Sequence, residues 1–173
     1  MIRDTSILLV GGAGKIGTAI SRGLVASGKV RPENLVVTAR HEHKLAAWDN
    51  PGVRLSTDNP GSFESLGRPV VLLCVHPDEV PDALGDLKRS AGFAGCPLVI
   101  SVATGVSTAR MEAMLPGPIP VVRTMPNLPA RIGSAATVVT RGRNAGEPHL
   151  AIAREIFETI GTVVVLDEKH LNA

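Results

Sequence analysis

The sequence predicts a single α/β domain built on a mostly parallel sheet. Segments typical of strands alternate with segments typical of helices along all 173 residues, a length that suits one domain with its own core. This alternation favours βαβ units, in which each helix crosses between parallel strands. Continuous apolar runs such as residues 69–75 indicate strands that are covered on both faces.

In the first half of the chain, an apolar run at 7–10 is followed by a helical pattern that places Ile16, Ile20 and Leu24 on one face. The dipeptide Ser27-Gly28 is expected to end this helix. The remaining elements expected here are strands at 35–38, 53–55 and 69–75, a short helix near 42–48, and a helix at 81–88.

In the second half, Pro148 is acceptable in the first turn of the amphipathic helix expected at 148–160. Asp167 has the character of an N-cap, so residues 168–173 are expected to begin another helix. The other elements expected here are strands at 98–102, 120–123, 136–139 and 161–166, and a helix at 108–115.

A glycine-rich motif, G-x-G-x-x-G at residues 12–17, connects the first strand to the first helix. In this position the helix amides and the positive end of the helix dipole meet, which is the geometry that holds a dinucleotide pyrophosphate. Gly12 is expected to make the tight turn, Gly14 to let the phosphates approach, and Gly17 to allow close helix–strand packing. The alternative is a structural turn that binds nothing. The other residues expected at this cofactor site are Gly11, Ala13, Lys15 and Ile16. The fold class is therefore α/β, Rossmann-type and doubly wound.

The end of the second predicted strand distinguishes NADP from NAD. NAD-specific domains usually carry an acid there, which bonds the ribose 2′-hydroxyl. Here the strand ends Val-Thr-Ala-Arg at residues 37–40, and the first acid is Glu42. Arg40, together with Thr38 and with His41 or Lys44, has the chemistry to hold a 2′-phosphate, although a solvated arginine is the simpler alternative. We expect NADP to be preferred over NAD.

Composition excludes several other classes of protein. Lys and Arg total 18 against 16 Asp and Glu, and only 2% of residues are aromatic, so nucleic acid is not an expected partner. No apolar run is long enough for a membrane span, and no signal peptide is expected before the first strand. Two cysteines suit a reducing cytoplasm. His41 and His43 do not share a helix face, and no metal site is predicted.

Three segments resemble one known family. Residues 121–130, VVRTMPNLPA, are similar to its V-V-R-x-M-P-N-x-P-A block; residues 98–107, LVISVATGVS, to L-V-I-S-x-A-A-G-V-S; and residues 74–77, CVHP, to A-V-K-P. The chain thus resembles pyrroline-5-carboxylate reductases, which reduce a cyclic imine to proline with NAD(P)H, from about residue 7 to its end. The resemblance implies further cofactor contacts at Asn59, Cys74, Val75, His76, Val102, Ala103, Thr104, Met125, Pro126 and Asn127.

The sequence also departs from the family pattern. His76 stands where lysine is usual, Lys15 where asparagine or glutamine is usual, and Thr104 where alanine is usual. After the segment that matches residues 170–173, family members continue into a bundle of helices that forms a dimer and helps to bind the imine. The resemblance thus divides the chain into an NADP-binding domain, 1–166, and the start of a helix, 167–173, that leads to this helical domain. A homo-oligomer is expected only if that domain is present.

The expected function is NADPH-dependent reduction of a cyclic imine, with this chain supplying the cofactor domain and inactive alone. The substrate is a small molecule. No catalytic residue is assigned; Asn127 either contacts the nicotinamide or substrate or braces a turn. One alternative is an NADP-binding module without turnover. Another is a deazaflavin-dependent NADP reductase, which shares the glycine loop but is not expected to share residues 125–127.

Overall fold

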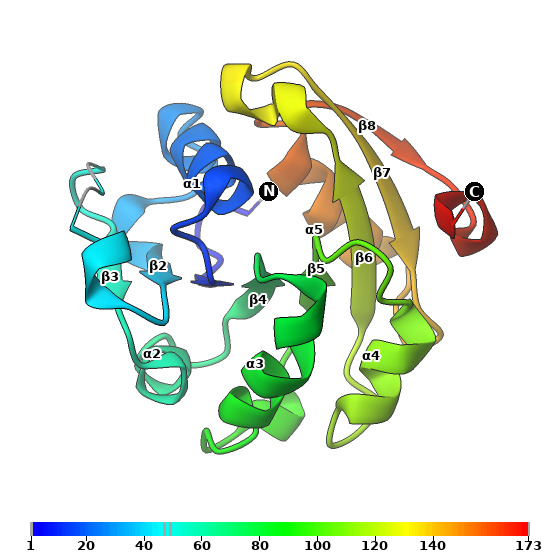
Figure 1. The fold of residues 1–173 in the computed structure, drawn as a ribbon, viewed down its shortest axis with the longest axis horizontal. Coiled ribbons are helices and arrows are strands. Elements are labelled where there is room, and N and C mark those ends of the chain that lie inside the picture. Colours follow the sequence, from blue (N-terminus) through cyan, green and yellow to red (C-terminus); the bar gives the residue numbers. More distant parts are fainter. Residues whose placement is uncertain (1, 47, 49, 173) are drawn as a thin grey trace.

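The computed structural model describes residues 2–46, 48 and 50–172. These residues form one eight-stranded sheet with the strand order β3-β2-β1-β4-β5-β6-β7-β8 (Figure 1). The strands are β1 Ile7–Val10, β2 Leu35–Thr38, β3 Arg54–Ser56, β4 Val70–Leu73, β5 Val99–Ser101, β6 Val121–Pro126, β7 Ala135–Arg141 and β8 Gly161–Val165. The α-helices are α1 Lys15–Ala26, α2 Asn59–Ser65, α3 Val80–Leu87, α4 Thr108–Met114 and α5 Glu147–Phe157.

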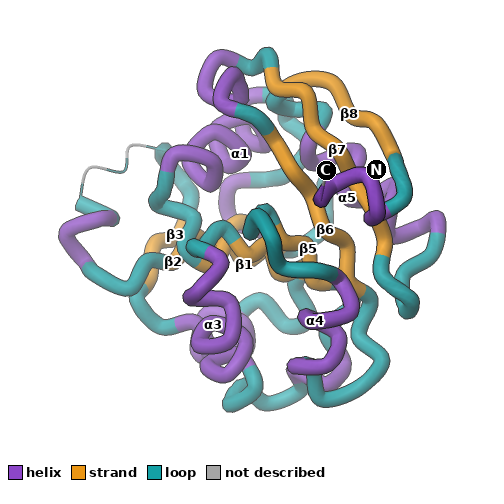
Figure 2. The backbone as a smooth tube through the Cα atoms, turned by 45° about the vertical axis from the view of Figure 1, so that its right-hand side comes forward, coloured by secondary structure: helices purple, strands orange, loops and turns teal. Residues whose placement is uncertain are grey.

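Neighbouring strands from β3 to β6 are parallel. The strand β7 pairs antiparallel with β6, and β8 then runs parallel to β7. Helices cover both faces, with α1 and α5 on one side and α2, α3 and α4 on the other (Figure 1). The turned view in Figure 2 shows the same three layers, with α1 above the central strands and α3 and α4 below them.

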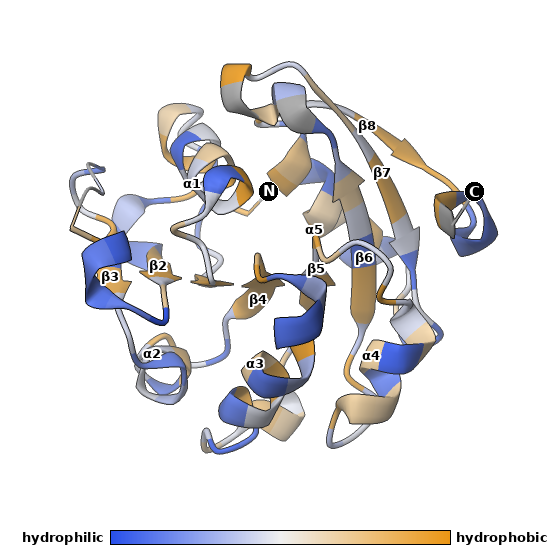
Figure 3. Ribbon diagram, in the orientation of Figure 1, coloured by the Kyte–Doolittle hydropathy of each residue, from blue (hydrophilic) through white to orange (hydrophobic). Residues whose placement is uncertain are grey.

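The two faces of the sheet bury separate hydrophobic clusters, because successive side chains of a strand point to opposite faces. In β1, Leu9 belongs to the cluster that includes Ile20 of α1 and Phe157 of α5. Leu8 belongs to the cluster that includes Phe63 of α2. All of these side chains are fully buried. The apolar colour of the central strands in Figure 3 reflects this double coverage, which fits the continuous apolar runs of the sequence.

The predicted Rossmann-type, mostly parallel sheet is confirmed, and each predicted strand has a counterpart in it. The sequence did not predict α2. The prediction of a helix near 42–48 was wrong for the described residues, which form only a 3-10 turn, η2 Glu42–Lys44. Residue 47 lies outside the described residues. The new helix expected at 168–173 is a 3-10 turn, η6 Glu168–Asn172, and residue 173 is not described.

The turn η6 is held to the sheet by the carboxylate of Glu168. One oxygen accepts a hydrogen bond from the Thr108 amide at 2.8 Å, and the other accepts from the Thr108 hydroxyl at 2.6 Å. Nη1 of Arg123, a residue only 1% exposed in β6, lies 3.2 Å from Oε1. Burial raises the pKa of Glu168, but these hydrogen bonds and the Arg123 charge outweigh it and hold the pKa below its ordinary value.

Candidate membrane-spanning helices and candidate metal-binding clusters are both absent from the described residues. Within the described ranges, no helix is both long and apolar enough to cross a membrane. The same residues contain no group of three or more His, Cys, Asp or Glu side chains placed to hold a metal ion.

Candidate functional site

A cleft lies where the sheet changes winding direction. The chain adds β2 and β3 on one side of β1, returns through α2 to place β4 on the other side, and continues to β5, so a crevice opens at the carboxyl ends of β1 and β4. The cleft has a volume of about 580 Å³. Nine of the predicted cofactor residues line it: Gly11, Ala13, Gly14, Thr38, Arg40, Asn59, Cys74, Val75 and His76.

The floor of this cleft is the turn after β1. Gly11 has a φ of +69°, and a Cβ built there would lie 2.6 Å from Cγ1 of Val75. Both observations require glycine, because side chains rarely adopt this φ and because the segment just after β4 passes so close. The tight turn was predicted at Gly12, but the left-handed residue is Gly11. Gly17 was predicted to allow close packing of the helix on the strand; a Cβ added there would overlap the backbone of Gly12, so the close approach is to the turn after β1.

The helix α1 begins just after this turn, so its first backbone amides lie at the glycine loop that lines the cleft. Its N-cap is Gly14, which has no side chain to accept hydrogen bonds from the first N–H groups. The twelve described residues of α1 include no acid in the first turn. A Cβ added to Gly14 would meet only the Gly11 carbonyl, at 3.7 Å, and would otherwise occupy the cleft. The bare backbone and uncapped amides fit the pyrophosphate of a dinucleotide.

A chain of hydrogen bonds fixes the wall beneath β2. The buried Thr38 hydroxyl donates to Oδ1 of Asn59 at 2.6 Å, and the Asn59 amide nitrogen donates to Oδ2 of Asp86 at 3.0 Å. Asp86 also pairs with Arg89. Thr38 and Asn59 therefore meet in the cleft wall, where the amide of Asn59 is oriented by partners from β2 and α3.

Arg40 lies at the mouth of the cleft, directly after β2. Its Nη1 is 3.3 Å from Oε1 of Glu79, and 61% of its side chain is exposed. His41 and Lys44 also line the cleft, and the ring of His41 stacks on that of His43. Several cationic or donor side chains thus gather at the end of β2, as the sequence suggested.

Cys74 lines the cleft at the end of β4 but has no reactive character. Burial raises the pKa of its thiol to about 12, so the thiolate is scarce at neutral pH. Burial likewise raises the pKa of Cys96 to about 11. Both cysteines are free thiols in the described chain.

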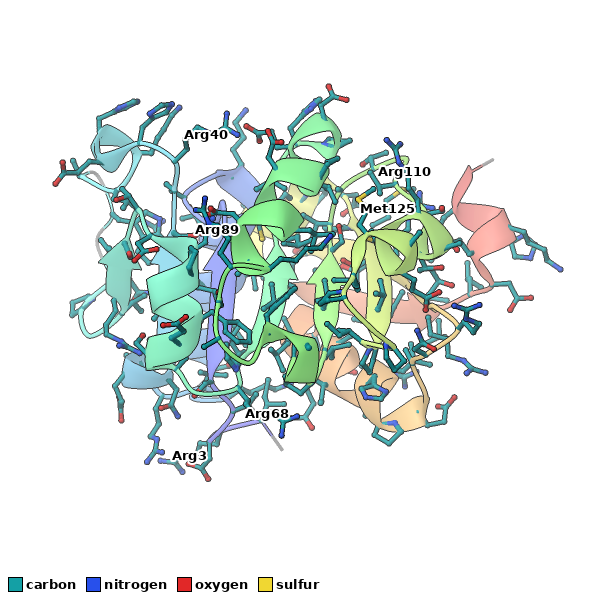
Figure 4. All side chains as sticks on the ribbon, turned by 90° about the horizontal axis from the view of Figure 1, so that it is seen from below. Arg3, Arg40, Arg68, Arg89, Arg110 and Met125 are labelled. Carbon is teal, nitrogen blue, oxygen red and sulfur yellow. The ribbon has the colours of Figure 1, made fainter. Side chains whose placement is uncertain are left out.

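The other predicted residues lie outside this cleft. The backbone N–H of Val102 donates to the Leu73 carbonyl at 3.1 Å, so residues after β5 lie beside the end of β4. Met125 and Arg40 lie toward the same edge in Figure 4, opposite Arg3 and Arg68. The predicted residues that do not line the cleft are Gly12, Lys15, Ile16, Gly17, Val102, Ala103, Thr104, Met125, Pro126 and Asn127.

Asn127 has a structural role in the protein. Its Oδ1 accepts a hydrogen bond from the Ala136 amide at 2.9 Å, which joins the end of β6 to the start of β7. The alternative that the sequence left open beside a contact to cofactor or substrate was an Asx-type turn brace; the bond found instead braces the longer connection between β6 and β7. Lys15 lines a separate groove, between α1 and the 3-10 turn η5 Leu128–Ile132.

An acidic wall on the far side of the cleft was not predicted from the sequence. Glu79, Asp82 and Asp86 all line it, on α3 and the 3-10 turn η3 Pro77–Glu79 that precedes it. Their spacing of three and four residues places them on one helix face, a signal that was available in the sequence.

The strand order and the glycine turn in the cleft define a Rossmann-type domain. A family model described as "NADP oxidoreductase coenzyme F420-dependent" matches residues 6–105, which is more than half of the chain. The chain belongs to this family. The matched part ends before residues 121–130, the block on which the resemblance to imine-reducing enzymes chiefly depends.

Named relatives extend the match along the chain. A pyrroline-5-carboxylate reductase from Corynebacterium melassecola is 33% identical over 98% of this chain and 62% of its own length. The structure of a pyrroline-5-carboxylate reductase from Coxiella burnetii superposes with a TM-score of 0.85 at 29% identity, over 96% of this chain and 61% of that one. A Plasmodium falciparum pyrroline carboxylate reductase with NADP bound shares the fold, at 21% identity and a TM-score of 0.80, over 98% of this chain and 60% of that one. The chain therefore spans about three fifths of the length of these relatives.

Proposed function

We propose that this chain is the cofactor-binding part of an NADPH-dependent reductase that acts on pyrroline-5-carboxylate or a related cyclic imine. One observation carries the proposal: the uncapped amides of α1 and the bare backbone of Gly14 open into the cleft between β1 and β4. The names of the relatives support the choice of reaction.

The residues of the chain divide the work of holding the cofactor. The turn at Gly11 to Gly14 and the first amides of α1 bind the pyrophosphate. Asn59, oriented by Thr38 and Asp86, faces the adenosine side. The cofactor supplies hydride when it is bound, while the protein supplies binding and orientation.

We further propose that NADP is preferred over NAD. Arg40 lines the cleft at the end of β2, and His41 and Lys44 line it nearby. A guanidinium with a lysine and a histidine donor nearby favours a 2′-phosphate over a neutral hydroxyl. The absence of an acid from residues 37–40 supports the same preference.

The nicotinamide is proposed to lie along the ends of β5 and β6. These strands follow β4 in the sheet, so a dinucleotide extending from the cleft reaches them next. The residues assigned to this end are Cys74, Val75, His76, Val102, Ala103, Thr104, Met125, Pro126 and Asn127. Several are backbone contacts in this proposal, since Ala103 is buried and Asn127 already bonds Ala136.

The proposal extends to the rest of the protein. Residues 1–166 form the NADP-binding domain, and residues 167–173 lead into a helical part that binds substrate and makes the dimer. The greater length of the relatives supports this division. The free thiols of Cys74 and Cys96 favour a cytoplasmic location, and a small molecule is the proposed substrate.

The test is a titration of the purified chain with NADPH, followed by nicotinamide fluorescence or calorimetry. Gly14→Ala places a methyl group in the cleft without a clash inside the fold. We expect its Kd to rise about tenfold, since one impaired charge-assisted hydrogen bond costs about 1.5 kcal/mol. The matched control is Gly85→Ala in α3, where an added Cβ meets nothing within 4 Å.

Two outcomes count against the proposed cofactor site. Failure of the wild-type chain to bind NADPH at millimolar concentration would remove the cofactor site. Equal binding by the Gly14 and Gly85 variants would move the pyrophosphate elsewhere. The same preparation is expected to bind NADPH without reducing pyrroline-5-carboxylate, and turnover by the 173 residues alone would contradict the proposed division of the protein.

A further inference from the structure

An ion pair crosses the mouth of the cleft between two loops that are distant in sequence. Arg40 follows β2, Glu79 ends the turn after β4, and β1 lies between these strands. Nη1 of Arg40 and Oε1 of Glu79 are 3.3 Å apart, and both residues line the cleft. Figure 4 shows Arg40 at this edge of the sheet, beside the green helical segment formed by η3 and α3.

The carboxylate of Glu79 is held in this position by the backbone. Its Oε2 accepts a hydrogen bond from the amide of His76 at 3.1 Å, while Oε1 faces Arg40. The side chain is 39% exposed, less than the 61% of Arg40. One oxygen thus anchors the carboxylate to its own turn, and the other remains directed at the guanidinium.

We propose that Glu79 is a specificity-determining residue, whose carboxylate competes with a 2′-phosphate for Arg40 and thereby lowers the preference for NADPH over NADH. This inference rests on the proposed function, because it assumes that the adenosine end of the cofactor lies beside Arg40.

The competition follows from charge. A 2′-phosphate brings about two negative charges to a guanidinium that already faces a carboxylate, so it must share or displace Glu79. The 2′-hydroxyl of NADH is neutral and does not repel the carboxylate. In NAD-specific domains an acid at the end of the second strand accepts a hydrogen bond from this hydroxyl. Residues 37–40 contain no such acid, and Glu79 brings one to the same region from the far side of β1.

The experiment compares NADPH and NADH dissociation constants for wild type and Glu79→Gln. Glutamine keeps an oxygen for the His76 amide and removes the charge. We expect the Kd for NADPH to fall by about 1.4-fold to fivefold, the range for an exposed ion pair. The Kd for NADH should stay the same or rise, so the ratio shifts toward NADPH. Asp78→Asn is the matched control, since Asp78 is adjacent and 92% exposed but pairs with His76.

A second variant separates competition for Arg40 from a general change in charge. In an Arg40→Leu background, Glu79→Gln should no longer change the ratio of the two dissociation constants. An unchanged ratio in the single variant overturns the inference, as does an equal shift with and without Arg40 or in Asp78→Asn. Normal NADPH binding with any of these results leaves the proposed function intact. If the wild type binds neither nucleotide, the proposed function fails and the inference fails with it.

Discussion

Replacing Gly11 with alanine tests whether the floor of the cleft is as closely packed as the structure indicates. Gly11 has a φ of +69°, and an added Cβ would approach Cγ1 of Val75 to 2.6 Å and the Cys74 carbonyl oxygen to 3.2 Å. Gly28 has almost the same φ, +66°, but an added Cβ there meets nothing within 4 Å. The two substitutions therefore share the backbone cost and differ in the overlap with the end of β4.

The structure sets the expected sizes. Gly28→Ala should lower the free energy of unfolding by about 1 kcal/mol, the cost of a left-handed alanine. Gly11→Ala should lower the free energy of unfolding by the same amount and by about 1–3 kcal/mol more, because the added methyl group overpacks against the end of β4. Its total of about 3 kcal/mol corresponds to a fall in Tm of about 6–12 °C for a domain of this size.

Urea denaturation followed by circular dichroism measures both variants, and an unchanged m-value shows that the midpoints report stability. If Gly11→Ala loses no more stability than Gly28→Ala, then the segments just after β1 and β4 do not approach as closely as described. Because the same overlap lies in the cleft floor, Gly11→Ala should also weaken NADPH binding, whereas Gly28→Ala should not.

Two further predictions concern hydrogen bonds that hold β6 to neighbouring segments. Glu168→Gln removes the charge beside buried Arg123, and we expect a loss of about 1–2 kcal/mol at pH 7. Because the folded-state pKa of Glu168 lies below its ordinary value of 4.5, this stabilisation is present above pH 4.5 and should disappear as the pH falls below it, which chemical denaturation across that range measures. Asn127→Ala removes the acceptor for the Ala136 amide and should cost about 0.5–1 kcal/mol, while Asn127→Asp, which keeps Oδ1, should restore most of it in the same assay.

Each prediction has an outcome that contradicts it. A stability gap between wild type and Glu168→Gln that does not narrow in acid would mean that the carboxylate is not the ionised partner of Arg123. Asp167→Asn is its control, because the Asp167 side chain is 80% exposed and its ion pair is with Lys169, which is itself 71% exposed. An Asn127→Ala variant of normal stability but weaker NADPH binding would favour a cofactor contact over the bracing role.

Most of the fold could be predicted because its central strands are apolar throughout. The run at 70–73 is buried along its whole length, and alternation with helices implied the parallel order. The helix α2 could not be predicted in this way. Its sequence, NPGSFES, has little helical periodicity. The helix depends on an N-cap, in which the Asp58 carboxylate accepts a hydrogen bond from the Gly61 amide. It also depends on Phe63, which packs edge-on against Phe93 from a distant turn.

The site was predictable where one segment contains the whole signal. The glycine motif is such a segment, since the turn, the helix start and the bare backbone are adjacent in sequence. The pair of Arg40 and Glu79 was not predicted, because it forms only when β2 and β4 lie on either side of β1. The tight turn was assigned to Gly12, whereas Gly11 is the left-handed residue, because the motif does not show which glycine the segment after β4 approaches.

The packing of η5 on α1 explains how two distant parts of the proposed cofactor site remain in register. Residues 121–126 form β6, and the chain then turns into η5, where Ala130 is 2% exposed and belongs to the same cluster as Ile20 of α1. The helix α1, whose first amides are proposed to bind the pyrophosphate, therefore contacts the segment that follows Met125 and Pro126. Because packed interiors transmit displacement, a shift of η5 should move the start of α1 as well. The antiparallel return of β7 makes this contact possible, since the chain reverses after η5 without a crossover helix.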